Sequence, residues 1–253
     1  VQAPSADMAG PYPTATAEYR LKAAIDSNIL PERATEVWAR AYWPKDLANR
    51  PSRRALKKHP LIAFLHGNHA TCGTGSRPRE DNSCEYTYEG TCPVGSVVTP
   101  NHEGYNYSAE NLASWGYIVI SINANRGITC AGGDRDDSGL ILARGRLVLR
   151  HLQLWSEWSQ VGGAPATFGD ANLFLGAVDL GNVGLMGHSR GGEGVRAALN
   201  LFRDTNSPWP QKIPGLDIKA IYEIGAVDGQ SHRVLDAPSV AWNQTLPLCD
   251  GDV

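Results

Sequence analysis

Long apolar runs are absent from this sequence of 253 residues, and its apolar stretches are strand-sized. A transmembrane helix needs about 20 consecutive apolar residues, so no membrane span is expected. Neither sign of charge dominates, because 23 Lys and Arg stand against 26 Asp and Glu, and no block of like charge occurs. This balance gives no indication of the basic surface of a nucleic-acid-binding protein, so no nucleic-acid partner is expected. The GxGxxG and GK[ST] patterns that bind phosphate groups are also missing, so no cofactor is expected.

The five cysteines lack CxxC spacing, which argues against a zinc site, and no metal is expected. They are better explained as disulfides of an extracytoplasmic protein than as free buried thiols of a cytosolic enzyme. Cys72 and Cys92 lie in one long loop and are the first expected pair. Since the count is odd, one cysteine is free or pairs outside this sequence. The start at Val1, without a signal-like segment, also agrees with a mature secreted chain.

Residues 1–16, rich in Pro, Ala and Thr, are predicted to form an N-terminal arm, and residues 17–253 one domain. Apolar runs bounded by turn residues predict strands, and apolar stripes with helical spacing predict helices. Strands are expected at 18–23, 36–42, 60–65, 116–123, 182–186, 218–224 and 245–248, and helices at 106–115, 140–158 and 192–203. This alternation predicts an α/β domain with a mostly parallel central sheet and helices on both faces.

The strongest motif is the GxSxG pattern Gly187-His188-Ser189-Arg190-Gly191. An apolar strand precedes it and an amphipathic helix follows it, which is the context of a nucleophile elbow. In such an elbow a serine sits on a sharp turn, and only glycines fit two positions before and after it. A phosphate-binding turn, the other interpretation, would need a different glycine pattern. Ser189 is therefore the predicted nucleophile.

An oxyanion hole should accompany the nucleophile. One donor is normally the amide of the residue after the serine, here Arg190, and the other comes from the loop after an earlier strand. That loop begins His66-Gly67-Asn68-His69, directly after the expected strand 60–65. The Asn68 amide is the expected second donor, and His69 is the next choice. His66 is expected to be a packed residue that shapes the loop.

Triad residues of this kind of enzyme follow the chain order serine, acid, histidine. After the expected strand 245–248, Asp252 is the predicted acid and Asp250 the alternative, and Asp228 is a weaker candidate. No histidine follows Asp252, and His232 lies in the wrong order. We therefore expect the catalytic histidine, the last strand and a closing helix to lie outside this sequence. They would belong to a C-terminal fragment of the same polypeptide, to a disordered segment, or to a stretch not included here.

Several segments resemble a group of secreted actinobacterial α/β-hydrolases, distant relatives of the dienelactone hydrolase, cutinase and PET-hydrolase branch. The similar segments are GLMGHSRGGEGV (184–195), FLHGNHATC (64–72), ASWGYIVISINAN (113–125) and PLCDGDV (247–253). The resemblance implies the α/β-hydrolase fold, with Ser189 and the Asp252 region as triad members and the histidine beyond the sequence. The cysteine-rich loop 72–92 and the stretch 132–139 depart from that group.

Hydrolysis of a small or polymeric carboxylic ester through an acyl-enzyme is the expected function. The alternatives are other chemistry of the same fold, such as cofactor-free perhydrolysis or C–C hydrolysis, and a non-catalytic secreted binding protein. Two further features of the sequence give weaker signals. The carboxylates of Asp134, Asp136 and Asp137 are better explained as a solvated loop than as a Ca²⁺ site, and Trp242 is a candidate for a substrate cleft.

Overall fold

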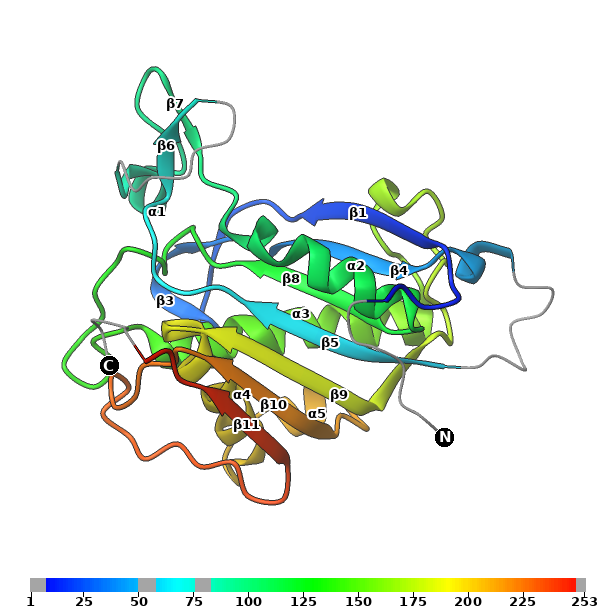
Figure 1. Cartoon of the computed structure of the whole chain (residues 1–253). Coiled ribbons are helices and arrows are strands. Elements are labelled where there is room, and N and C mark those ends of the chain that lie inside the picture. The colour runs from blue at the N-terminus through cyan, green and yellow to red at the C-terminus, as the bar shows by residue number, and fades with distance from the viewer. Residues whose placement is uncertain (1–7, 50–57, 76–82, 249–253) are drawn as a thin grey trace.

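The computed structural model describes residues 8–49, 58–75 and 83–248 of the chain. A seven-stranded sheet in the order β1-β4-β8-β5-β9-β10-β11 forms its centre (Figure 1). Strands β8, β5, β9, β10 and β11 are parallel, and β1 and β4 are antiparallel at one edge. The strands are β1 (Thr14–Arg20), β4 (Trp38–Pro44), β5 (His59–Leu65), β8 (Ile118–Asn123), β9 (Val178–His188), β10 (Ile218–Ile224) and β11 (Ala241–Thr245). This mostly parallel sheet confirms the predicted α/β class.

Helices and two small hairpins surround the sheet. The α-helices are α1 (Glu85–Glu89), α2 (Asn106–Ser114), α3 (Ile141–Val161), α4 (Arg190–Arg203) and α5 (Trp209–Lys212). Short 3₁₀ turns cover Lys45–Asn49, Asn101–Tyr105 and Ala166–Phe168. Strands β2 (Ala24–Asp26) and β3 (Leu30–Thr35) form one hairpin, and β6 (Cys72–Thr74) and β7 (Ser96–Val98) the other. Together with α1, the second hairpin projects from the body of the molecule (Figure 1).

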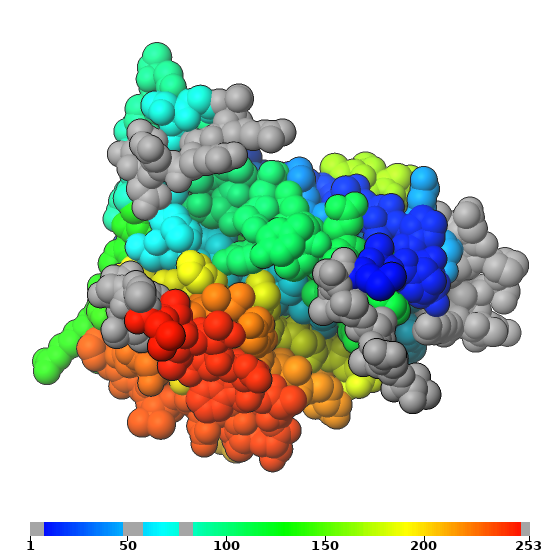
Figure 2. Space-filling model, viewed as in Figure 1, coloured from blue at the N-terminus to red at the C-terminus, as the bar shows by residue number. Residues whose placement is uncertain are grey.

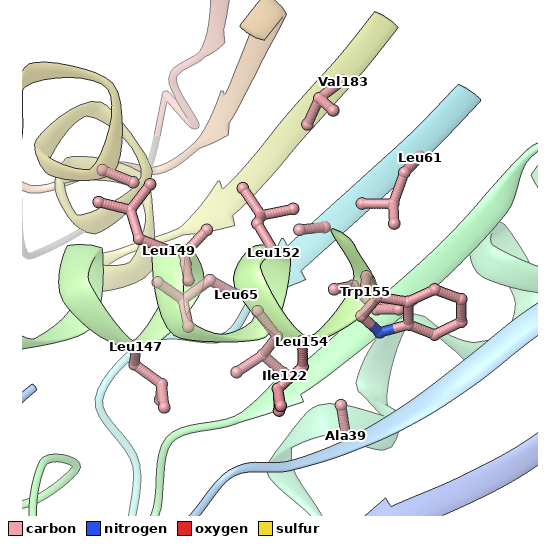
Figure 3. Close-up of a cluster of buried hydrophobic side chains, with 14 of the residues drawn as sticks. Ala39, Leu61, Leu65, Ile122, Leu147, Leu149, Leu152, Leu154, Trp155 and Val183 are labelled. Carbon is pink, nitrogen blue, oxygen red and sulfur yellow. The ribbon is translucent and has the colours of Figure 1, made fainter. Parts of the chain in front are cut away.

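Helices α3 and α4 cover one face of the sheet and bury the main core. Alternate residues of β5, such as Leu61 and Leu65, point to this face, as expected for a strand with period 2. They meet the apolar stripe of α3, where Leu152 and Trp155 are fully buried (Figure 3). The two helices also touch closely, since a Cβ added at Gly145 of α3 would lie 2.7 Å from the backbone nitrogen of Ala198 in α4. The predicted stripe of helix 140–158 is thus the packing face.

The opposite face is only partly covered. Helix α2 packs against Phe64, Val119 and Met186, which point away from α3. Beside α2, strands β9, β10 and β11 reach the surface without a helix of the described residues over them (Figure 2). An apolar groove of about 1300 Å³ lies there, with Trp242 and Trp115 among its lining residues. Trp242 therefore lies in a groove, and this groove runs over the face of the sheet opposite α3 and α4.

Most strands differ from their predicted bounds by one to four residues, and β1 and β11 are two examples. Strand β1 begins at Thr14, inside the expected arm, and residues 1–7 lie outside the described part of the chain. The expected strand 245–248 was wrong, because the observed strand is Ala241–Thr245. Its register pairs Thr245 with Ile224, so the apolar Leu246 and Leu248 follow the strand and are exposed. All five residues of β11 are exposed because it is an edge strand beside the open groove.

Two disulfides link the loops above the carboxyl ends of the strands. The expected Cys72–Cys92 pair is confirmed, and a second disulfide joins Cys84 to Cys130. Cys249 lies outside the described residues. Both bonds hold the projecting part of the chain, and Cys84–Cys130 ties it to the loop after β8. In the described ranges, no helix combines the length and apolarity that crossing a membrane requires.

Candidate active site

The carboxyl ends of β5, β9 and β10 meet at one edge of the sheet. Leu65 pairs with Gly187, and His188 pairs with Ile224, so the three strands end side by side. The Ser189 amide donates a hydrogen bond to the carbonyl oxygen of Ile224 at 3.0 Å. This bond fixes the first residue after β9 at the point where crevices of parallel α/β sheets bind ligands.

Ser189 occupies a tight turn between β9 and α4. Its backbone angles are φ 54° and ψ −127°, in a region that residues with a side chain rarely adopt. A Cβ added at Gly191 would lie 2.6 Å from the carbonyl oxygen of His66, and one at Gly187 would collide with the carbonyl of Gly191. These backbone contacts explain the glycines of the motif. The Ser189 side chain is half-buried and so remains accessible.

The loop after β5 lies against this turn. A Cβ added at Gly67 would be 2.8 Å from the Cβ of Ser189. Within the described ranges, no acceptor bonds the backbone amide of Asn68. The Arg190 amide, at the first position of α4, is also without an intrahelical acceptor, as helix geometry requires. The structure thus brings together the loop and the turn that carry the expected oxyanion donors.

The side chain of His69 also contacts the turn at Ser189, through its imidazole ring. Its imidazole stacks on that of His188, with centroids 5.8 Å apart and ring planes 10° from parallel. Since His188 directly precedes Ser189, this stack joins the loop after β5 to the turn at Ser189. The motif alone gave no sign of it, because the two histidines are far apart in sequence.

His66 is a buried packing residue, as expected. Its Nδ1 donates to the carbonyl of Gly67 at 2.8 Å, and its Nε2 accepts from the Ala124 amide at 2.9 Å. Burial lowers the pKa of His66 well below its ordinary value, and the nearby Arg144 guanidinium lowers it further. With both ring nitrogens occupied, His66 is neutral and braces the loop.

Arg144 of α3 is a site residue that the sequence analysis missed. It is fully buried, and it donates to the carbonyl oxygens of His66 (3.2 Å) and Gly67 (3.5 Å). Its second Nη donates to the Oδ1 of Asn68 at 3.4 Å and to the hydroxyl of Thr129 at 3.3 Å. Burial lowers the pKa of Arg144 to about 9. No sequence signal could reveal it, since arginine side chains are rarely buried in full.

The acid and base predictions remain predictions. Asp250 and Asp252 lie outside the described residues. Asp228 accepts a 3.1 Å bond from Arg196 and is largely exposed. The His232 ring bonds the Ser138 hydroxyl at 3.1 Å. Across the described part of the chain, no side chain bonds the Ser189 hydroxyl.

Buried carboxylates of α4 and β10 hold the loop after β10. Glu193 accepts hydrogen bonds from the amide and hydroxyl of Ser231 and from the Gln230 amide. Glu223 forms a 2.6 Å ion pair with Arg196, although burial raises the pKa of the Glu223 carboxyl. Both carboxylates are fully buried and have partners. They stabilise the loop beside the elbow and are not free to act on a substrate.

A cluster of Glu18, His102 and Glu103 has the spacing of a metal site. Its chemistry does not fit one. Arg40 pairs with both carboxylates, at 3.4 Å to Glu18 and 3.0 Å to Glu103, and so supplies the positive charge. The Asn123 amide nitrogen donates to His102 Nδ1, which leaves the proton on Nε2 and removes that nitrogen as a ligand.

The acidic loop before α3 is likewise explained without an ion. Asp137 accepts hydrogen bonds from the amides of Ile141, Leu142 and Ala143 and thereby caps the helix. The Oδ1 of Asp134 accepts hydrogen bonds from the backbone amides of Asp136 and Asp137. The carboxylates therefore satisfy backbone donors of their own loop. The expectation of a solvated loop was incomplete, because Asp137 is buried and structural.

Comparison with protein-family models found no matching family, and comparison with curated proteins found no significant relative. The site is therefore interpreted from its geometry.

Proposed function

We propose that this chain carries the nucleophile and oxyanion hole of a secreted serine hydrolase that cleaves carboxylic esters. The observation that carries the proposal is the strained, accessible turn at Ser189, with the Gly67 backbone packed against its Cβ. Strain of this kind persists only where surrounding structure enforces it, and it clusters at active sites. The turn at the end of a central parallel strand supports the α/β-hydrolase fold. Two disulfides support an extracytoplasmic location.

In the proposed reaction, the Ser189 hydroxyl oxygen attacks the ester carbonyl carbon, and a histidine base takes the hydroxyl proton. The negative charge on the tetrahedral oxygen is held by the amides of Arg190 and Asn68 and by the amino-terminal end of α4. Collapse of the intermediate breaks the ester bond, and the histidine gives its proton to the leaving alcohol. Water then hydrolyses the acyl-enzyme by the same steps. We assign the acid to Asp252, with Asp250 as the alternative, and the base to a histidine outside these 253 residues.

A fluorophosphonate probe tests this assignment in the full-length natural protein. We expect stoichiometric labelling of Ser189, loss of labelling in Ser189→Ala, and unchanged labelling in Ser138→Ala, whose hydroxyl is also exposed. Hydrolysis of p-nitrophenyl esters should disappear only in Ser189→Ala. Equal residual hydrolysis by the wild type and Ser189→Ala would refute the proposal and favour a binding protein. Peroxide-dependent halogenation without ester turnover would favour perhydrolysis instead.

A further inference from the structure

Burying the charged guanidinium of Arg144 in this core carries an unfavourable desolvation free energy. A guanidinium without water needs compensating partners, and apolar replacements of buried charges are often more stable. Among the residues that the structure describes, no carboxylate forms an ion pair with Arg144. Its hydrogen-bond partners are four neutral oxygen atoms, and three of them belong to the loop after β5. Core stability alone does not account for such an arrangement.

The direction of these bonds decides where the loop amides point. In a trans peptide, the carbonyl oxygen and the following N–H point in opposite directions. The Gly67 carbonyl accepts from both Arg144 and His66, so the Asn68 N–H of the same peptide points away from α3. The described chain has no cis peptide bond. Holding the Gly67 oxygen therefore fixes the orientation of the Asn68 amide.

The Asn68 side chain is a second point of attachment. Its Oδ1 accepts from the Cys130 amide at 2.7 Å and from Arg144 at 3.4 Å. Cys130 is held by its disulfide to Cys84 and has a φ of 69°. The neighbouring Thr129 carbonyl accepts from the Thr87 hydroxyl of α1 at 2.6 Å. The loop after β8 is thus fastened to α1 and in turn holds Asn68.

From this arrangement we infer that Arg144 is a positioning residue for the oxyanion hole. It keeps the Gly67–Asn68 peptide in the orientation that aims the Asn68 amide at the substrate oxygen. The Cys84–Cys130 disulfide secures the other bond to the Asn68 side chain, so activity also depends on this disulfide. The catalytic consequence rests on the proposed function, whereas the control of the peptide orientation does not.

The test replaces Arg144 by Met, which keeps an unbranched chain and removes every donor. Loss of one oxyanion donor lowers kcat by about 10² to 10³ fold, so we expect a fall of about 10² fold with KM within about threefold. The rate of Ser189 phosphonylation should fall in parallel, and Arg144→Lys should restore part of it. Arg150→Met is the matched control, because Arg150 lies on the same helix and pairs with Asp26 at 3.4 Å. It should leave kcat unchanged.

A second pair of variants covers the case in which Arg144→Met does not fold. Replacing Cys84 and Cys130 by Ala should lower kcat at least tenfold, whereas replacing Cys72 and Cys92 should change it less than threefold. Equal effects of the two pairs, or a folded Arg144→Met with wild-type kcat, would overturn the inference.

Backbone dynamics separate this inference from the proposed function. The ¹⁵N order parameter of the Asn68 amide should fall in Arg144→Met and stay unchanged in Arg150→Met. If the wild type shows no labelling of Ser189 but this change occurs, the proposed function fails and the role of Arg144 in orienting the Gly67–Asn68 peptide stands. If Ser189 is labelled equally in both proteins and the Asn68 amide is unchanged, the positioning role fails alone.

Discussion

Replacing Ser189 by glycine should give a more stable protein than replacing it by alanine. Both variants lose the hydroxyl, so the comparison isolates the backbone. The native turn has φ 54° and ψ −127°. Glycine adopts positive φ without steric penalty, whereas alanine keeps the Cβ that causes the strain.

The size of the difference follows from three contributions. A strained backbone of this kind costs about 1–3 kcal/mol in a residue with a Cβ. Glycine loses more chain entropy on folding, which offsets roughly 0.5–1 kcal/mol. Removing the Cβ that faces Gly67 also loses some buried apolar area, worth at most about 0.8 kcal/mol for a full methylene. The balance is about 1 kcal/mol in favour of Ser189→Gly.

Urea unfolding followed by circular dichroism measures this difference. Ser108, in the first turn of α2, is the matched control, because there the glycine variant should be less stable than the alanine variant, by up to about 1 kcal/mol. The two sites should therefore show opposite signs. If Ser189→Gly is no more stable than Ser189→Ala, the backbone at the elbow is not strained. Strain at Ser189 then gives no support to the proposed function.

Three further predictions concern stability and can be checked by the same unfolding assay. Gly191→Ala should destabilise the protein by about 1–3 kcal/mol, because its Cβ meets backbone carbonyls that cannot move away, whereas Gly132→Ala, with open space around it, should stay within about 0.5 kcal/mol. Glu223→Gln should cost about 3 kcal/mol, because it removes the negative charge that compensates the buried guanidinium of Arg196, and a wild-type value would show that the pair is not buried in solution. Burial lowers the pKa of His151 to about 3, so between pH 6.5 and 3 the unfolded chain binds a proton that the native state does not. Stability should therefore fall with decreasing pH, by at most about 1.4 kcal/mol per unit from this residue, and His151→Gln should reduce that slope.

The elbow could be predicted from sequence because its constraints are local. Gly187 and Gly191 follow from the steric needs of a turn only five residues long, which an apolar strand precedes and an amphipathic helix follows. The same reasoning located His66 as a packed residue, since it directly follows a buried strand. Local spacing thus located the turn at Ser189 and the loop that lies against it.

Features that depend on distant contacts could not be predicted. Arg144 and Asn68 are 76 positions apart, and their contact exists only because α3 packs beneath the loop. Strand β11 was displaced in the prediction because Leu246 and Leu248 suggested a buried strand, whereas the true strand is more polar and pairs along only one edge. The hairpin of β2 and β3 was missed because its short strands mix exposed, half-buried and buried residues and contain no apolar run.

The near contact of α3 and α4 has a mechanical consequence. With Gly145 backing onto Ala198, and Gly194 leaving room for the Arg144 side chain, the helix that starts at the elbow and the helix that carries the guanidinium cannot slide past each other. A larger side chain at position 145 would meet the backbone of Ala197 and Ala198 and push α3 away from α4. The displacement would reach the Arg144 guanidinium and the loop that it holds, so this buried glycine controls the elbow's surroundings from a distance.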